Sequence, residues 1–304
     1  MEQVKLTILG SGSALPSGNS FPCSQILEWR NKQFMIDCGE GAQIRIRQAA
    51  VKSNRLGHIF ISHLHGDHCF GLIGLISSFG MLNRTADLYI HSHGDLKKLM
   101  QKQLDYFCTE LPFNIYFEPF HPKKNETIYE DRTISVSTIP LKHRVPTAGF
   151  LFREKQKDRH IKRDMIDFYE IPVWKIPKIK QGADFETASG EIIPNRLLTT
   201  PPDPAKSYAY CSDTMYFEKI IPIIQDVDCL YHEATFASTE AVRAQKTMHS
   251  TAGQAGKIAR KANVKKLIIG HCSARYKTHQ QLLTEATNEF ENTALAEDMK
   301  SFYF

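Results

Sequence analysis

The chain has 304 residues, 42% hydrophobic and 23% charged, which excludes a disordered or collagen-like protein and fits a globular one with a full core. Its 38 Lys and Arg against 33 Asp and Glu give a formal charge of +5, which permits a polyanionic partner without requiring one. The amino terminus lacks a signal-peptide pattern and no run of about 18 apolar residues occurs, so we expect a cytoplasmic protein that does not insert into a membrane.

Short apolar runs typical of β-strands recur along the chain. They occupy residues 4–9, 24–29, 33–37, 58–62, 87–91, 133–139, 149–153, 207–212, 228–233 and 265–271. Between them, apolar positions three and four apart predict helices over 71–82, 95–107, 251–262 and 279–290. Strands cluster early and again late, so we predict an α/β fold of two sheets packed face to face under outer helices, rather than one wound parallel sheet.

One stretch interrupts this alternation. Residues 153–163, REKQKDRHIKR, hold six Lys or Arg against two acids, and the following residues 164–182 contain two prolines, a tryptophan and no clear period. We predict that residues 154–184 form an inserted flexible arm. The alternative is a solvated charged loop.

Residues 60–72, FISHLHGDHCFGL, crowd potential metal ligands into one turn after a predicted strand. Alternate residues at a strand end point the same way, so His63 and His65 can hold one ion while Asp67 and His68 face another. Imidazole nitrogen and carboxylate oxygen suit a borderline divalent ion such as Zn²⁺. The seven cysteines are scattered and never spaced as C-x-x-C, which disfavours both a disulfide framework and a thiolate zinc site.

Two ions need more ligands than this turn supplies, and His143, Asp213 and His271 each directly follow a strand-like run. Side chains at strand ends converge on one rim, and the two oxygens of Asp213 can bridge two ions. The sequence therefore predicts two overlapping ligand sets. They are His63, His65, His143 and Asp213 for one ion, and Asp67, His68, Asp213 and His271 for the other.

A second histidine-rich segment, HSHGD at 91–95, also follows a predicted strand. Leucine stands at position 96, where the first motif has His68, and Asp95 is well placed to cap the helix that follows. We interpret His91 and His93 as loop or capping residues rather than as ligands.

Eight segments spread over nearly the whole chain match the motifs of one enzyme family. They are LGSGSALP (9–16), FMIDCGEGAQ (34–43), SHLHGDHCFGL (62–72), PLKHRVPTAGF (140–150), CSDT (211–214), HEATF (232–236), MHST (248–251) and GHCSARY (270–276). Together they resemble ribonuclease Z, the metallo-β-lactamase-fold endoribonucleases that remove the 3′ trailer of precursor transfer RNA. The resemblance implies one domain over 1–304, a sandwich of two sheets flanked by helices, two zinc ions per subunit and a homodimer.

The resemblance also implies roles for single residues. Asp67 would be the general base for the attacking water, and Glu233 with His249 would deliver a proton to the leaving oxygen, as suits a histidine held by a carboxylate. Asp37 is interpreted as a carboxylate that orients a ligand histidine, or else as a turn residue. Arg275 would contact substrate phosphate, or else be an exposed helix arginine.

Members of this family usually carry a protruding arm, with a glycine-proline-rich tip that grips transfer RNA, between the motifs that hold His143 and Asp213. Here that interval is 213 minus 143, or 70 positions, which is long enough for an arm, although the tip YEIPVWKIPKIKQG is not glycine-rich. We expect Lys155, Lys157 and Arg159 in its basic half to contact substrate phosphates. The amino-terminal segment PSGNSFP, residues 16–22, also lacks the cation that many relatives carry there.

The leading hypothesis is therefore a zinc-dependent endoribonuclease acting on precursor transfer RNA. One alternative is a metallohydrolase of small phosphodiesters or thioesters, because one fold hosts many chemistries. A second alternative, a non-catalytic RNA-binding protein, is disfavoured because the predicted ligand sets are complete.

Overall fold

The computed structural model describes residues 3–15 and 20–304 and divides them into two compact units, which we treat separately. The larger unit holds the described residues up to Asp131, together with Ser135–Arg153 and Lys206–Phe304. The smaller holds Arg132–Ile134 and Glu154–Ala205. Within the described residues, none of the helices has both the length and the apolar character needed to span a bilayer.

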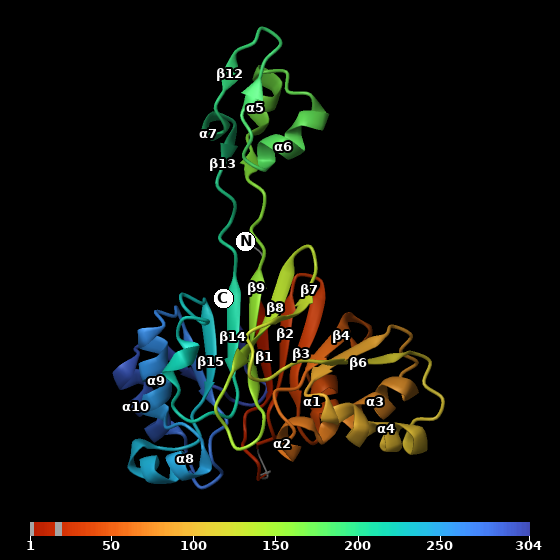
Figure 1. The fold of residues 1–304 in the computed structure, drawn as a ribbon, viewed down its shortest axis with the longest axis vertical. Coiled ribbons are helices and arrows are strands. Elements are labelled where there is room, and N and C mark those ends of the chain that lie inside the picture. Colours follow the sequence, from red (N-terminus) through yellow and green to blue (C-terminus); the bar gives the residue numbers. More distant parts are fainter. Residues whose placement is uncertain (1–2, 16–19) are drawn as a thin grey trace. The chain divides into compact units, whose positions relative to one another are not determined.

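Two seven-stranded sheets form the centre of the larger unit (Figure 1). The first has the order β18-β1-β2-β3-β4-β5-β6, with β1 Lys5–Gly10, β2 Ser24–Trp29, β3 Lys32–Cys38, β4 Leu56–Phe60, β5 Leu88–Ser92, β6 Ile115–Pro119 and β18 Ser301–Tyr303. The second has the order β17-β16-β15-β14-β9-β8-β7, with β7 Thr127–Glu130, β8 Ile134–Pro140, β9 Ala148–Glu154, β14 Ser207–Cys211, β15 Cys229–Glu233, β16 Leu267–Gly270 and β17 Thr293–Leu295. Strands β3 to β6 run parallel, as do β14 to β17.

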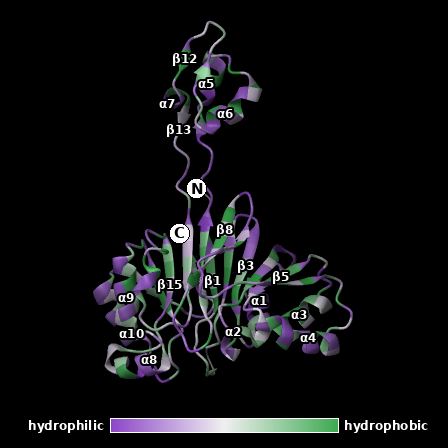
Figure 2. Ribbon diagram, viewed as in Figure 1, coloured by the Kyte–Doolittle hydropathy of each residue, from purple (hydrophilic) through white to green (hydrophobic). Residues whose placement is uncertain are grey.

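The two sheets pack face to face through aromatic side chains. The ring of Phe34 on β3 lies 5.6 Å from that of Phe152 on β9, and the ring of Phe60 on β4 lies 5.4 Å from that of Phe150. Hydrophobic residues are concentrated in the strands, whereas the helices carry many hydrophilic ones (Figure 2). This pattern is expected where each strand is covered on both faces.

Helices cover the outer face of each sheet. On the first sheet lie α1 Ala42–Gln48, α2 Gly66–Cys69, α3 Gly71–Met81 and α4 Asp95–Phe107, and on the second lie α9 Ala252–Lys261 and α10 Gln280–Glu289 (Figure 1). The short helix α8 Ala241–Thr247 lies in the connection between β15 and α9. A capping box between Thr251 and Gln254 fixes the start of α9. The predicted layers are confirmed, and the four predicted helices match α3, α4, α9 and α10 to within one residue at each end.

The interpretation of His91 as a loop or capping residue is wrong. His91 lies in β5 and is 3% exposed, with its ring stacked on Phe60 at 4.5 Å and its Nε2 3.1 Å from His58 Nδ1. Burial lowers its pKa to about 3, so it packs as a neutral aromatic ring. The predicted cap is wrong as well, because Gly94 occupies the cap position of α4 and Asp95 lies in the first turn.

The smaller unit has a hydrophobic core of its own. Its helices and strands are β10 His160–Ile161, α5 Arg163–Phe168, α6 Ile176–Lys180, β11 Phe185–Glu186, β12 Ile192–Ile193, α7 Asn195–Leu198 and β13 Thr199–Thr200. Buried Ile179, Phe185 and Leu198 pack together, and the Asn195 side chain donates to the carbonyl oxygens of Ile179 and Ala183. The predicted arm, residues 154–184, lies within this unit, which continues to Ala205. The flexibility of the arm and its insertion into one domain over 1–304 stay predictions.

Candidate metal centre

The seven predicted ligands meet because each lies at or just beyond the carboxyl end of a strand in the larger unit. His63 and His65 follow β4, Asp67 and His68 lie in α2, and His143, Asp213 and His271 follow β8, β14 and β16. A Cβ at Gly66 would lie 2.2 Å from the exposed ring of Phe70, so any larger residue at this position would require that ring to move. Parallel strands end at a common edge, which brings ligands far apart in sequence into one cluster.

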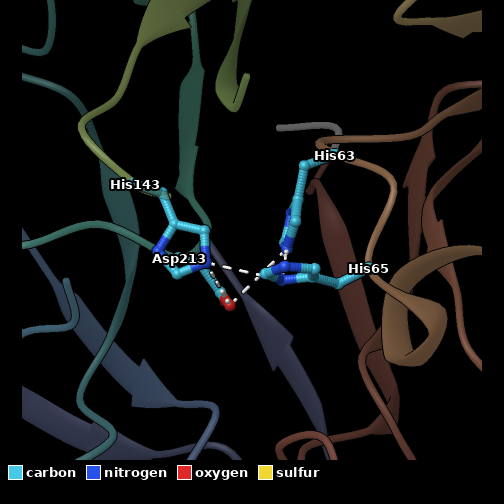
Figure 3. Close-up of side chains that lie close together, drawn as sticks. All are labelled: His63, His65, His143 and Asp213. Carbon is cyan, nitrogen blue, oxygen red and sulfur yellow. Dashed lines mark hydrogen bonds and ion pairs between the residues drawn. The ribbon is translucent and has the colours of Figure 1, made fainter. Parts of the chain in front are cut away.

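Four of these side chains converge on one point, as Figure 3 shows. His65 Nδ1 lies 3.0 Å from His63 Nε2 and 3.4 Å from His143 Nε2, and Asp213 Oδ2 lies 3.6 Å and 3.7 Å from the same two Nε2 atoms. Ligands about 2.1 Å from a tetrahedral zinc ion lie about 3.4 Å from one another, so this spacing fits an ion between them.

The second predicted set lies beside the first and shares Asp213. Asp67 Oδ2 is 3.2 Å from His68 Nε2 and 3.3 Å from His271 Nε2, and Asp213 Oδ1 is 3.5 Å and 3.3 Å from the same nitrogens. His68 Nε2 and Asp213 Oδ1 are buried without a hydrogen-bond partner. Such orphaned polar atoms carry a large desolvation penalty, which a shared cation would remove.

Hydrogen bonds on the outer side of the cluster turn the ligand nitrogens inward. His143 Nδ1 donates to the Met248 carbonyl oxygen at 2.9 Å. His63 Nδ1 lies 3.0 Å from Ser62 Oγ and His271 Nδ1 lies 2.9 Å from Thr235 Oγ1, and because these hydroxyls donate to Asp37 and Glu233, the two Nδ1 atoms are assigned as donors to them. A neutral imidazole in this tautomer presents an unprotonated Nε2 to the cluster. Converging lone pairs repel one another unless a cation lies between them, so the donor set fits a metal.

Asp37 holds the ligand histidine His68. Its Oδ2 accepts from His68 Nδ1 at 2.7 Å and from the Tyr210 hydroxyl at 2.6 Å, and the Ser62 backbone N–H donates to its Oδ1 at 2.8 Å. The carboxylate is fully buried. It lies where a carboxylate that orients a ligand should lie, and it also joins the two sheets, because Ser62 follows β4 and Tyr210 is on β14.

Burial and charge favour cation binding in this cluster. Burial lowers the pKa of His63, His65 and His143, so these rings are neutral near pH 7. For Asp213, burial opposes ionisation, but the surrounding histidines, led by His271 and His68, outweigh it and hold the pKa of the carboxyl below its usual range. Burial likewise opposes ionisation of Asp67, and the charge of His68 again lowers its pKa below the usual range.

The predicted pair Glu233 and His249 is assembled beside the cluster. His249 Nδ1 donates to Glu233 Oε1 at 2.8 Å, while His249 Nε2 lies 3.9 Å from Asp213 Oδ2. Burial alone would lower the pKa of His249, but the Glu233 carboxylate outweighs this effect and raises the pKa to about 9. Glu233 is itself immobilised, because it also accepts from the backbone N–H groups of Thr214, Thr235 and Ser250.

A cleft of about 450 Å³ opens onto these groups. Its walls include Asp67, His249, Phe236 and Arg144. Arg144 is exposed, and its position directly after the ligand His143 is the sequence signal that marks it. Thr235, which bridges Glu233 and His271, carries no sequence signal beyond its place in the HEAT motif.

The predicted substrate contacts are less clearly placed. Within the described part of the chain, Arg275 lies beside the cleft rather than in its lining, with its guanidinium 4.8 Å from the Phe236 ring centroid and 2.8 Å from Glu240. Lys157 pairs with Glu154 at 3.2 Å, Arg159 donates to Thr199 Oγ1 at 2.7 Å, and the Lys155 backbone donates to the Thr133 carbonyl. Their contacts with substrate stay predictions. Of PSGNSFP, residues 16–19 lie outside the described residues.

Comparison with known proteins identifies the family. The chain is 57% identical over 298 residues to ribonuclease Z of Phocaeicola vulgatus, covering 98% of this chain and 96% of that protein, and 55% identical to ribonuclease Z of Bacteroides thetaiotaomicron, covering 98% and 94%. The chain belongs to the ribonuclease Z family. Residues 4–172 also match a family model described as Anti-Pycsar protein Apyc1, whereas the ribonuclease Z relatives align with nearly the whole chain.

Solved structures agree on the fold. Human tRNase Z, short form, superposes with a TM-score of 0.71 at 21% identity, covering 98% of both chains. A metallo-β-lactamase-fold protein of Bacillus subtilis superposes with a TM-score of 0.71 at 17% identity, covering 100% of both chains. The predicted metallo-β-lactamase fold and the predicted family are both confirmed.

We expect Asp37→Asn to weaken metal binding about 10- to 100-fold, because the amide cannot accept from His68, Ser62 and Tyr210 as the carboxylate does. Asparagine tolerates the left-handed backbone at this residue, where φ is 55°, so the substitution tests the carboxylate rather than the turn. Competition with a chromophoric chelator measures the affinity. The exposed Asp105→Asn is the control, and equal affinities of the two variants would contradict the role of Asp37.

Proposed function

We propose that this ribonuclease Z family member is a metal-dependent endoribonuclease that removes the 3′ trailer of precursor tRNA. The observation that carries the proposal is that five members of the ligand cluster and His249, which is held by the buried Glu233, line one cleft in a chain 57% identical to a ribonuclease Z. Hydrolysis breaks the bond between phosphorus and the tRNA 3′ oxygen, which leaves a 3′-hydroxyl on the tRNA and a phosphate on the trailer.

Two zinc ions per subunit are the finer part of this proposal. His63, His65, His143 and Asp213 would hold one, and Asp67, His68, Asp213 and His271 the other. Bound divalent cations lower the pKa of water and neutralise charge on a phosphate. The neutral imidazoles, the ionised carboxylates and the orphaned atoms at His68 and Asp213 support this loading.

The chain's own groups handle the protons. Asp67 is an ionised carboxylate in the cleft lining and accepts a proton from the attacking water as general base. His249 is fixed through Nδ1 by Glu233, so its Nε2 is free to donate a proton to the departing 3′ oxygen. The five hydrogen bonds that Glu233 accepts keep this imidazole from turning away from the cleft.

We expect Asp67→Asn and His249→Ala each to lower kcat for trailer removal by about 10²- to 10⁴-fold, because each removes one proton-transfer group. The measurement is cleavage of a precursor tRNA transcript with Zn²⁺ supplied, with exposed Asp105→Asn as the control. Efficient hydrolysis of a small chromogenic phosphodiester by a wild-type protein that neither binds nor cuts RNA would instead favour the small-substrate alternative.

The smaller unit is proposed to bind the tRNA. It carries Lys155, Lys157 and Arg159 together with the exposed apolar side chains of Phe168, Val173 and Trp174. Cations attract phosphates, and aromatic rings can stack on bases. The compact unit runs to Ala205, so a clean deletion must remove it whole rather than end at residue 184.

Replacement of residues 155–204 by a short linker is expected to raise KM for precursor tRNA by about tenfold or more while leaving hydrolysis of a small diester unchanged. The alanine triple variant of Lys155, Lys157 and Arg159 should show part of the same effect. Its control is the alanine triple variant of the exposed Lys97, Lys102 and Lys219 in the larger unit. An unchanged KM after loss of the whole unit would contradict this assignment.

A homodimer and a cytoplasmic location complete the proposal. Exposed apolar side chains lie on and beside α3 and α4, namely Met81, Leu82, Leu99, Tyr106 and Phe107, and a second copy could cover them. All seven cysteines are free thiols, as suits a reducing compartment. A sedimentation mass of one chain at micromolar concentration would contradict the dimer, and recovery of the enzyme outside the cytosolic fraction would contradict the location.

A further inference from the structure

A second cleft, of about 560 Å³, lies in the larger unit and plays no part in the chemistry described above. Its lining comes from the segment that follows β5, from the segment that follows β6 and from Pro146. The polar side chains in that lining are His93, Asp95, Lys98, His121 and Lys123.

This second cleft lies on the same sheet edge as the metal centre. Strands β4, β5 and β6 are parallel neighbours, so their carboxyl ends share one edge. The metal ligand His63 follows β4, whereas His93 follows β5 and His121 follows β6. The second cleft therefore continues the row of strand ends on which the metal centre is built, where ligands bind in open sheets of this kind.

One short loop separates the two clefts. His143 and Arg144 line the metal cleft, and Pro146, two residues further on, lines the second. Arg144 is an exposed cation, and no salt bridge to it occurs among the described residues. A polyanion that leaves the metal cleft over this loop would meet Arg144 first and then the second cleft.

The charge of the second cleft suits a phosphate. Lys98 and Lys123 outnumber the single carboxylate Asp95, and the imidazoles of His93 and His121 can donate further hydrogen bonds. The ammonium of Lys98 is 3.5 Å from Asp95 and its side chain is 83% exposed, so this pair is weak and its cation is available. Phe120 also lines the second cleft, where it is held in place because it is buried, with its ring 5.7 Å from the ring of Phe150.

We propose that the second cleft binds backbone phosphates of the RNA strand next to the cleavage point, with Lys98 and Lys123 as the main contacts and Arg144 between the clefts. The inference rests on the proposed function and deepens it. The ligand is a phosphodiester that belongs either to the trailer or to the tRNA side of the cut.

The chain offers closely matched controls for a test. Lys97 and Lys124 are exposed, adjacent in sequence to Lys98 and Lys123, and outside the lining of the second cleft. Lys98→Glu with Lys123→Glu, and Lys97→Glu with Lys124→Glu, therefore make the same change in net charge on the same two segments. Circular dichroism would establish that both double variants are folded.

Steady-state cleavage of precursor tRNAs with short and long trailers would be measured for both double variants and the wild type. We expect the cleft variant to raise KM about tenfold over the control variant with kcat unchanged. The slope of log affinity against log salt should fall by about 0.7 for each single-strand phosphate that the variant no longer neutralises. Arg144→Ala should raise KM as well, and Arg144→Lys should restore part of the loss.

The trailer lengths distinguish the two sources of phosphate. An effect confined to the long trailer assigns the cleft to the trailer, and an equal effect on both assigns it to the tRNA side. Equal KM values for the cleft and control variants would overturn the inference while leaving the proposed function intact. Fluorescence anisotropy of the same RNAs without turnover measures binding independently of cleavage, and equal Kd values there would overturn the inference even if the wild type failed to cut.

Discussion

The centre of this protein depends on a buried carboxylate placed among histidine nitrogens. Asp213 is 2% exposed, its Oδ2 faces His63 and His143, and its Oδ1 has no hydrogen-bond donor within the described structure. A charge in such surroundings is costly unless cations compensate it. Strand ends from both sheets are needed to place these side chains together. The ligand cluster therefore forms only when the two sheets are packed against each other.

Asp37 links the ligand cluster to the packing of the two sheets. It accepts hydrogen bonds from His68 in α2, from Ser62 after β4 and from Tyr210 on β14, so one buried group fixes a ligand and joins both sheets. Loss of the carboxylate would leave several buried donors unsatisfied, each at a cost of about 1–3 kcal/mol. Stability and metal binding are therefore coupled through the same side chain.

Much of the fold and the site could be predicted because the signals were local. Strand and helix periodicities were clear, and the turn His63 to His68 carries its ligands within six positions. The sequence does not predict the burial of His91, because Phe60 and His58 contact it from a neighbouring strand. The sequence does not identify Arg144 as a cleft residue, because only the folded loop shows which side chains line a cleft. The extent of the smaller unit to Ala205 depends on packing among Ile179, Phe185 and Leu198, which no charge run reveals.

The loop before α9, which contains Met248 and His249, limits which substitutions the enzyme tolerates. The carbonyl of Met248 fixes the ring of His143, and the next residue supplies the imidazole held by Glu233. A shift of this loop would misplace a metal ligand and a proton donor at once. Substitutions here that impair metal binding and substitutions that impair proton transfer should therefore have strongly non-additive effects on activity. Natural variation is therefore expected to preserve the backbone path of these two residues as one inherited unit, while the side chain of Met248, whose contribution is its carbonyl, is freer to change.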